Sequence, residues 1–138
     1  MSINPVLPGA DRSGVYRAPR GVVTLAKQVS SARMGWLELK LGRVGTKQQF
    51  LAACARQLEF PEHFGGNWDA LADCLREVDV CGDNGCVLHV QNAARFAKAA
   101  PDDYATALEI LRLAADYWKD KRVLFLALVD GDASLPQL

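Results

Sequence analysis

The sequence predicts an α/β fold with a small parallel three-stranded sheet packed with helices. Three short segments, at residues 36–41, 86–90 and 123–129, have the patterns of buried or half-buried strands. Segments with helical periodicity separate them. Strands that are separated by helices pair in parallel through right-handed crossovers, which is the basis of the prediction.

The N-terminal part of the chain is expected to supply an arm, a short helix and the first strand. Residues 1–20 are rich in proline, glycine and arginine and have no period, so they are expected to form a loose arm. Residues 22–32 fit a short helix that stops before Gly35. Residues 36–41 alternate strictly and put their leucines on one face, as in a half-buried strand.

Two helices are expected between the first and second strands. Thr46 suits the N-cap of a helix that runs to about Glu59. Pro61 disfavours a continuation, because the residue before a proline is pushed out of the α region. Asn67 then stands where an N-cap belongs, before the apolar stripe of the next helix. That stripe consists of Trp68, Leu71, Leu75 and Val78.

The second half of the chain continues the alternation. A strand at residues 86–90 is followed by a short helix at residues 92–100. Pro101 fits the first position of a longer helix that runs to about Trp118. Residues 123–129 are apolar throughout, so this third strand should be covered on both faces.

The long helix that ends near Trp118 carries two apolar surfaces. Its main stripe should face the sheet and consists of Leu108, Leu111, Ala115 and Trp118. A second strip, rotated away from the first, consists of Ile110, Leu113 and Tyr117. Because a helix that is apolar on two sides is normally covered on both, part of residues 15–33 is expected to pack on the second strip.

Length and composition indicate a single cytoplasmic domain. A chain of 138 residues is long enough to bury a substantial core. The N-terminal residues lack the apolar segment of a secretory signal. The longest apolar run, Val123 to Val129, is too short to cross a bilayer, so no membrane anchor is expected.

The cysteines leave two interpretations. Cys54 and Cys74 fall within expected helices and fit small core residues. Cys81 and Cys86, with His89 nearby, raise the alternative of a metal site. Zinc sites usually need four closely spaced ligands and a fourth is missing, so neither a metal nor a cofactor is expected.

Charge is distributed unevenly although the net charge is zero. Residues 1–58 carry nine basic and two acidic side chains, whereas residues 59–83 carry one basic and seven acidic ones. An acidic surface repels the phosphates of nucleic acids. It suits a basic protein partner, because complementary fields speed association. The alternative is an acidic face that serves only solubility.

Asp69 and Asp73 are the acidic residues that the helical spacing brings together. They lie four residues apart, so they share the face opposite the apolar stripe. Like charges in this arrangement repel by about 0.2–0.5 kcal/mol. Asp69, in the first turn, recovers part of this from the helix dipole. Taken alone, such a pair is typical of a solvated helix face.

The surrounding stretch FPEHFGGNWDALADCL, from Phe60 to Leu75, resembles the signature of the barstar family, intracellular inhibitors of the ribonuclease barnase. The matching residues are Pro61, Glu62, Phe64, Gly65, Asn67, Asp69, Ala70, Leu71, Asp73, Cys74 and Leu75. A weaker similarity extends from about Trp36 to Asp130. The expected division is a partly ordered N-terminal extension (1–34), a barstar-like domain (35–130) and a C-terminal tail (131–138).

The resemblance implies a sheet of three parallel strands and an acidic helix that blocks a nuclease. In that family the residue matching Asp73 enters the nuclease active site, and the one matching Asp69 pairs with an arginine nearby. The same surface would be bordered by His63, Phe64, Asn67 and Ala72. The expected partner is a basic ribonuclease or a similar basic protein, and the free protein is expected to be monomeric.

Some positions depart from the family pattern. His63 stands where the family has a tyrosine, and Ala72 where it has a tryptophan. Leu113 aligns with an acidic residue of the family. Arg76 lies one turn beyond Asp73, where it is placed to pair with that carboxylate and to repel a cationic nuclease site.

Two other classes of function remain open. An adaptor would keep the fold and bind a different basic protein without inhibiting a nuclease. Catalysis is disfavoured, because Asp69 and Asp73 lack the contrast in environment that an acid/base pair needs. His63 is the remaining candidate for proton transfer, and a lone loop histidine is usually a polar surface residue. No nucleophile elbow, P-loop or dinucleotide fingerprint occurs.

Overall fold

The computed structural model describes residues 8–60, 66–77, 81 and 84–138. Within them the chain forms a four-stranded, fully parallel sheet with the strand order β1-β4-β3-β2. The strands are β1 (Gly14–Arg17), β2 (Gly35–Lys40), β3 (Cys86–Gln91) and β4 (Phe125–Val129). The α/β class and the parallel pairing predicted from the sequence are therefore confirmed.

The sheet has one strand more than the sequence predicts. Residues 1–20 are expected to be a loose arm, but they contain the 3-10 helix Ala10–Arg12 and strand β1, which pairs with β4. The Phe125 N–H donates to Ser13 Oγ at 3.0 Å, which ties this segment to the start of β4. Without β1, one edge of an apolar strand would be unpaired. A strand this short cannot show a convincing alternation, so periodicity alone missed it.

Five α-helices are defined in the described residues: α1 (Val22–Ser31), α2 (Lys47–Gln57), α3 (Trp68–Leu75), α5 (Ala94–Ala99) and α6 (Pro101–Asp120). Their bounds differ by only a few residues from the predicted ones. Thr46 Oγ1 accepts from the Gln49 N–H at 3.2 Å, and Pro101 lies in the first turn of α6, as predicted. None of these helices is both long and apolar enough to cross a membrane.

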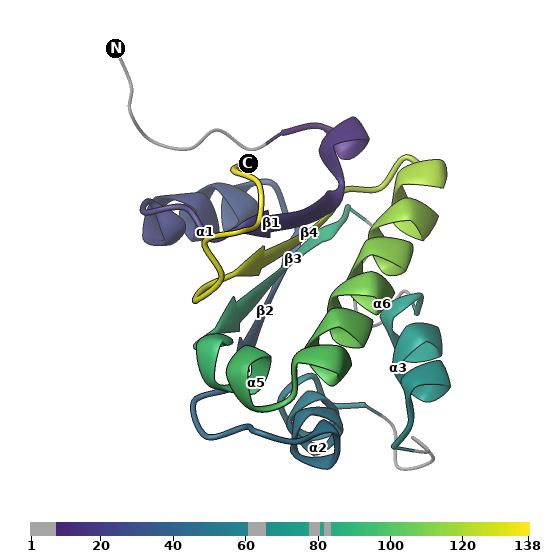
Figure 1. Ribbon diagram of the computed structural model, residues 1–138. Coiled ribbons are helices and arrows are strands. Elements are labelled where there is room, and N and C mark those ends of the chain that lie inside the picture. Colours follow the sequence, from purple (N-terminus) through teal and green to yellow (C-terminus); the bar gives the residue numbers. More distant parts are fainter. Residues whose placement is uncertain (1–7, 61–65, 78–80, 82–83) are drawn as a thin grey trace.

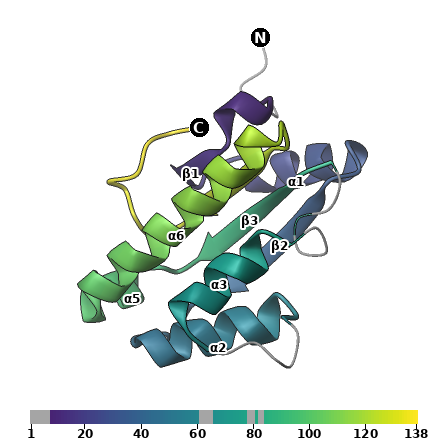
Figure 2. The same ribbon diagram turned by 90° about the vertical axis from the view of Figure 1, so that its right-hand side faces the viewer.

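The helices cover the two faces of the sheet unequally. α2, α3 and α6 lie on one face and α1 lies on the other (Figure 1). α6 packs against β1 and β4, and α2 packs against β2. Figure 2 shows α3 beside α6 and α2, on the face of the sheet that these three helices cover. The predicted acidic helix is therefore a surface element supported by the long helix α6.

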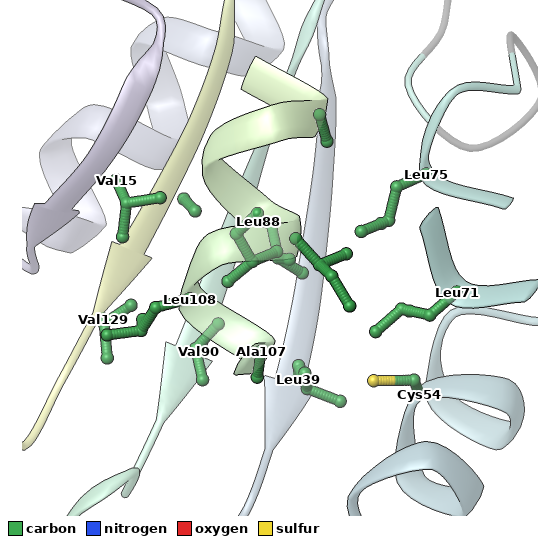
Figure 3. Close-up of a cluster of buried hydrophobic side chains, with 14 of the residues drawn as sticks. Val15, Leu39, Cys54, Leu71, Leu75, Leu88, Val90, Ala107, Leu108 and Val129 are labelled. Atoms are coloured by element: carbon green, nitrogen blue, oxygen red, sulfur yellow. The ribbon is translucent and has the colours of Figure 1, made fainter. Parts of the chain in front are cut away.

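The larger core lies between the sheet and α2, α3 and α6 (Figure 3). Leu71 and Leu75 point from α3 toward this core, which also contains Leu39 and Leu88 of the sheet. The predicted main stripe of α6 is buried here, namely Leu108, Leu111, Ala115 and Trp118. The packing thus fixes which side of α3 remains at the surface.

A second, smaller core lies between α1 and the opposite face of the sheet. Leu25 and Val29 of α1 are fully buried against Val87, Leu126 and Leu128. Successive residues of β4 alternate between the two cores. The prediction that the third strand is covered on both faces is therefore confirmed.

The predicted position of the N-terminal segment is wrong. The sequence predicts that part of residues 15–33 covers the strip of Ile110, Leu113 and Tyr117 on α6. In the structure α1 instead packs on the far face of the sheet. The central strands are apolar on both faces and need cover on both. On the face opposite α6 the sheet presents Val87, Leu126 and Leu128, and this is the apolar surface that α1 buries.

The residues that follow β4 return to β1. The Arg17 N–H donates to Pro136 O at 2.8 Å, and Arg17 forms a parallel bridge with Gln137. Leu135 is buried in the larger core, and Leu138 packs on the smaller one. In Figure 1 this C-terminal segment, in yellow, runs beside β1 and α1. It therefore covers part of the outer edge of β1.

The cysteines form two groups. Cys54 and Cys74 are buried free thiols, as the sequence predicts, and burial raises the pKa of Cys54 to about 12. Cys81 and Cys86 are joined in a disulfide, with their Cα atoms 4.9 Å apart. The two cysteines that raise the alternative of a metal site are therefore bonded to each other, and His89 contacts Glu38.

Candidate functional site

Helix α3 begins at Trp68, directly after Asn67, the residue that the sequence predicts as its N-cap. Asn67 has an extended backbone, and its Oδ1 accepts from the Ala70 N–H at 2.8 Å. A cap of this kind contributes about 1 kcal/mol to helix stability. Asp69 lies in the first turn, where the positive end of the helix dipole favours a carboxylate. Local sequence is therefore enough to define where this helix starts.

The apolar side of α3 is anchored in the larger core. Leu71 and Leu75 are buried, and Trp68 packs on Phe50 with the ring centroids 5.9 Å apart. At the other end of the helix, Trp118 Nε1 donates to Leu75 O at 2.9 Å. One of the last carbonyls of α3 thus has a partner from α6. The helix is held at both ends and along one side.

The opposite side of α3 presents Asp69 and Asp73 to solvent. The structure confirms the prediction that they share a face. The Asp73 side chain is 72% exposed, and its Oδ1 lies 2.7 Å from Arg76 Nη2, the pairing that the sequence predicts. Asp69 has no hydrogen bond or ion pair with any residue that the structure describes. The two carboxylates therefore differ, because Asp73 is paired and Asp69 has no partner among the described residues.

Arg76 has a defined position where α3 meets α6. Its Nε donates to Ala72 O at 3.2 Å. Its guanidinium carbon lies 5.9 Å from the centroid of the Tyr117 ring, and Lys121 Nζ lies 5.2 Å from the same centroid. Cations over an aromatic face are stabilised by the charge distribution of the ring. The acidic face thus carries a positive charge along its border with α6.

Beside Arg76, α3 and α6 form an open groove of about 230 Å³. Its lining consists of Ala72, Arg76, Ile110, Leu113, Ala114 and Tyr117. Ile110 and Ala114 are buried, whereas Leu113 is 55% exposed. The strip that the sequence predicts on α6 therefore exists, but it borders the acidic helix instead of lying beneath the N-terminal segment.

The fold around α3 agrees with one protein family. Residues 34–130 match the family model described as Barstar (barnase inhibitor). This chain belongs to the barstar family. The match begins just before β2 and ends just after β4, so it includes α3 and α6 and leaves β1 and α1 outside. A comparison with curated proteins found no match.

The predicted site residues of the barstar-like region divide into two sets. Asn67, Asp69, Ala72, Asp73 and Arg76 all belong to α3 or its caps. His63 and Phe64 lie outside the described residues. Ala72 packs partly against the larger core, at the position where the family resemblance implies a tryptophan. Its small side chain leaves the groove beside it open.

Sequence reasoning missed a polar cluster on the α1 face of the barstar-like sheet. Glu38 accepts from Trp36 Nε1 at 2.7 Å and from Gln91 Nε2, and it lies 3.1 Å from His89 Nδ1. Burial opposes ionisation of Glu38, but these hydrogen bonds, from Trp36, Gln91 and His89, hold its pKa below the ordinary value. The cluster ties the edge strand β2 to β3. Its only sequence signal is the pair of polar residues at alternate positions on each strand.

The predicted charge asymmetry has a spatial counterpart. Lys40, Arg43 and Arg56 line a shallow pocket of about 290 Å³ beside α2. In the part of the chain that the structure describes, these cations form no ion pair. The exposed carboxylates of Asp69 and Asp73 belong to α3 instead. The barstar-like region therefore presents both an acidic helix and a separate basic pocket.

Proposed function

We propose that this protein inhibits a basic ribonuclease inside the cell by placing the acidic face of α3 against the nuclease active site. The observation that carries the proposal is the exposed pair Asp69 and Asp73 on a helix fixed at both ends. The family match to a barnase inhibitor supports the same role. The protein itself is expected to have no ribonuclease activity.

The physical basis is charge complementarity. A ribonuclease binds the phosphates of RNA with arginine, lysine and histidine, and a carboxylate on a rigid helix occupies such a site without being cleaved. Because α3 is held in place before binding, little conformational entropy is lost on association. The acidic face also attracts a basic protein over a distance and so speeds the encounter.

The pair between Asp73 and Arg76 does not prevent this role. Both side chains are well exposed, and an exposed ion pair contributes about 0–1 kcal/mol. A cationic active site offers Asp73 a stronger partner once water is excluded, so Arg76 can be displaced at small cost. The Asp73 carboxylate is therefore available to a nuclease despite its neighbour.

Arg76 is also the observation that favours a second candidate function. Together with the small Ala72 and the exposed Leu113, it makes the α3 surface less acidic and more apolar at its α6 border. Such a surface suits an adaptor that binds another basic protein without blocking a nuclease. The two functions differ in whether the bound partner loses ribonuclease activity.

The first prediction tests inhibition directly. Titrating the protein into barnase and other basic bacterial ribonucleases should abolish RNA cleavage by one of them at a one-to-one ratio. Asp73→Asn should weaken that complex by about 2–5 kcal/mol, the cost of truncating one partner of a buried charge pair in interfaces that include barnase–barstar. The loss should appear mainly as faster dissociation.

Asp11→Asn is the matched control, because Asp11 is an exposed aspartate on the N-terminal 3-10 helix, away from α3. It should leave binding unchanged. Binding without loss of cleavage would favour the adaptor. No binding to any ribonuclease of the panel would refute the inhibitor function.

A further inference from the structure

The groove between α3 and α6 is an apolar surface that the described chain leaves uncovered. Among the described residues, the exposed large hydrophobic side chains are Leu113 in this groove and Val23 on α1. α1, the helix that the sequence predicts as cover, packs on the other face of the sheet. Exposed apolar surface next to charged residues is typical of a protein-binding site.

The groove and the acidic face are parts of one continuous surface. Ala72 and Arg76 line the groove, and Asp73 lies between them on the same helix. Figure 2 shows α3 lying beside part of α6. A protein interface of ordinary size buries about 800 Å² on each partner. A partner centred on Asp73 therefore also covers the groove.

The size and lining of the groove define what it can hold. An apolar cavity of about 150 Å³ is large enough for a benzene molecule, so a groove of about 230 Å³ has room for one large side chain. Ile110 and Ala114 make its buried base, and Leu113 and Tyr117 make its α6 wall. No carboxylate lines it, so the attraction here is apolar, in contrast to that of Asp69 and Asp73.

We propose that this groove takes an apolar side chain, aromatic or leucine-like, from the same basic partner protein that docks on Asp69 and Asp73. This inference rests on the proposed function and adds the chemistry of a second contact. The partner surface would then present cations to α3 and, next to them, one apolar anchor to α6. An anchor seated in a pocket and ringed by polar contacts is the usual form of an interface hot spot.

The experiment compares two exposed aliphatic positions, Leu113 and Val23, with barnase as the probe. Leu113→Ser removes the apolar wall of the groove, and Val23→Ser makes the same kind of change on α1, behind the sheet. Both side chains are exposed, so neither variant should lose its fold, which circular dichroism and thermal melting check. Affinity is measured by calorimetry at ionic strengths of about 0.01 M and 1 M, where Debye lengths are about 30 and 3 Å.

Leu113→Ser is expected to lower affinity by about tenfold at both ionic strengths, because an apolar contact is not screened by salt. It should also make the heat-capacity change of binding less negative, since less apolar surface is buried. For Asp73→Asn the loss of affinity should instead be larger at low salt than at high salt, because salt screens the charge interaction. Val23→Ser should change affinity by less than about twofold.

The two proposals fail in different ways. If Asp73→Asn weakens binding and Leu113→Ser matches the Val23→Ser control, the groove is empty in the complex and only this inference is overturned. If neither barnase nor any other basic ribonuclease binds the unaltered protein, the proposed function fails and this inference fails with it.

Discussion

Arg76 determines how much negative charge α3 can offer to a partner. It is the basic residue of the acidic segment, and its guanidinium lies 2.7 Å from Asp73 Oδ1. Asp69 is left as the carboxylate without a described partner. A nuclease that binds here must therefore either displace Arg76 from Asp73 or accept a cation at the edge of its active site.

Removing this cation provides the second residue-level test. Arg76→Ala should change the free energy of unfolding by less than about 1 kcal/mol, because the pair is exposed. It should speed association with a basic ribonuclease, and the gain should be larger at low salt, because a like charge is removed from the encounter surface. Stopped-flow measurement of the association rate at low and high salt checks the faster association and its dependence on salt.

Arg112→Ala is the matched control, since Arg112 pairs with Glu109 at the same i,i+3 spacing on α6. It should have a smaller effect on association. Slower association of Arg76→Ala would mean that the partner presents an acidic group at this point, which would favour the adaptor over the inhibitor.

At the level of elements, the Glu38 cluster is the main electrostatic link between β2 and β3. Glu38 faces His89 across the ladder and also accepts from Trp36 and Gln91. β2 is an edge strand, so it lacks a second neighbour to hold it. The carboxylate therefore adds side-chain hydrogen bonds to the one backbone ladder that joins β2 to β3.

The cluster predicts a specific response to acid. The pKa of Glu38 is below its ordinary value of 4.5 in the folded protein, so its contribution to stability is present above about pH 4.5 and is lost as the pH falls through the folded-state pKa. Glu38→Gln should lower stability at neutral pH by about 1 kcal/mol, a value reduced because the side chain is 38% exposed.

The corresponding measurement is urea unfolding of both proteins between about pH 7 and pH 3. Stability of the variant should fall less steeply with acid than that of the unaltered protein. Part of the slope should remain, because Asp132, which accepts from Ser134 and Tyr104, also has a lowered pKa. Glu109→Gln should follow the unaltered protein, and identical slopes for Glu38→Gln would contradict the role of the cluster.

Local signals predicted most elements of this fold. The alternation of residues 36–41 located β2. The N-caps Thr46 and Asn67, and Pro101 in the first turn of α6, located the starts of three helices. Strand β1 was missed because four residues carry too little pattern. The position of α1 could not be predicted, since an apolar stripe shows that a helix is covered but not which surface it covers.

The parts of the candidate site that depend on residues close together in the sequence were also predictable. Helical spacing put Asp69 and Asp73 on one face and Arg76 beside Asp73. The groove depends on how α3 lies against α6, and the Glu38 cluster depends on the register between two strands. Neither of these long-range relations is encoded in a short stretch of residues.

At the level of the whole molecule, the N-terminal segment is part of the fold. α1 buries the second face of the sheet through Leu25 and Val29, and β1 completes the sheet beside β4. Each large apolar side chain buried in this way contributes about 1.5–3 kcal/mol. The segment outside the family match therefore stabilises the part inside it.

Deletion of residues 1–33 should lower the unfolding midpoint and expose a surface that binds a hydrophobic dye. A milder test compares two substitutions on α1. Leu25→Ala should cost about 2–5 kcal/mol, because Leu25 is fully buried, whereas Val23→Ala should cost little, because Val23 is 71% exposed. Equal stability of the truncated and full-length chains would show that the segment is only a tail.

The strand order also sets when the molecule can fold during its synthesis. β4 lies between β1 and β3, yet it is the last of the four strands to leave the ribosome. The bond from Phe125 N–H to Ser13 Oγ spans 112 residues, and contacts this distant in sequence form slowly. β1 must therefore wait, unpaired, until its neighbour has been made. Trp118, which donates to Leu75 O at the end of α3, also emerges late, so the acidic helix is held at that end only after α6 has been made.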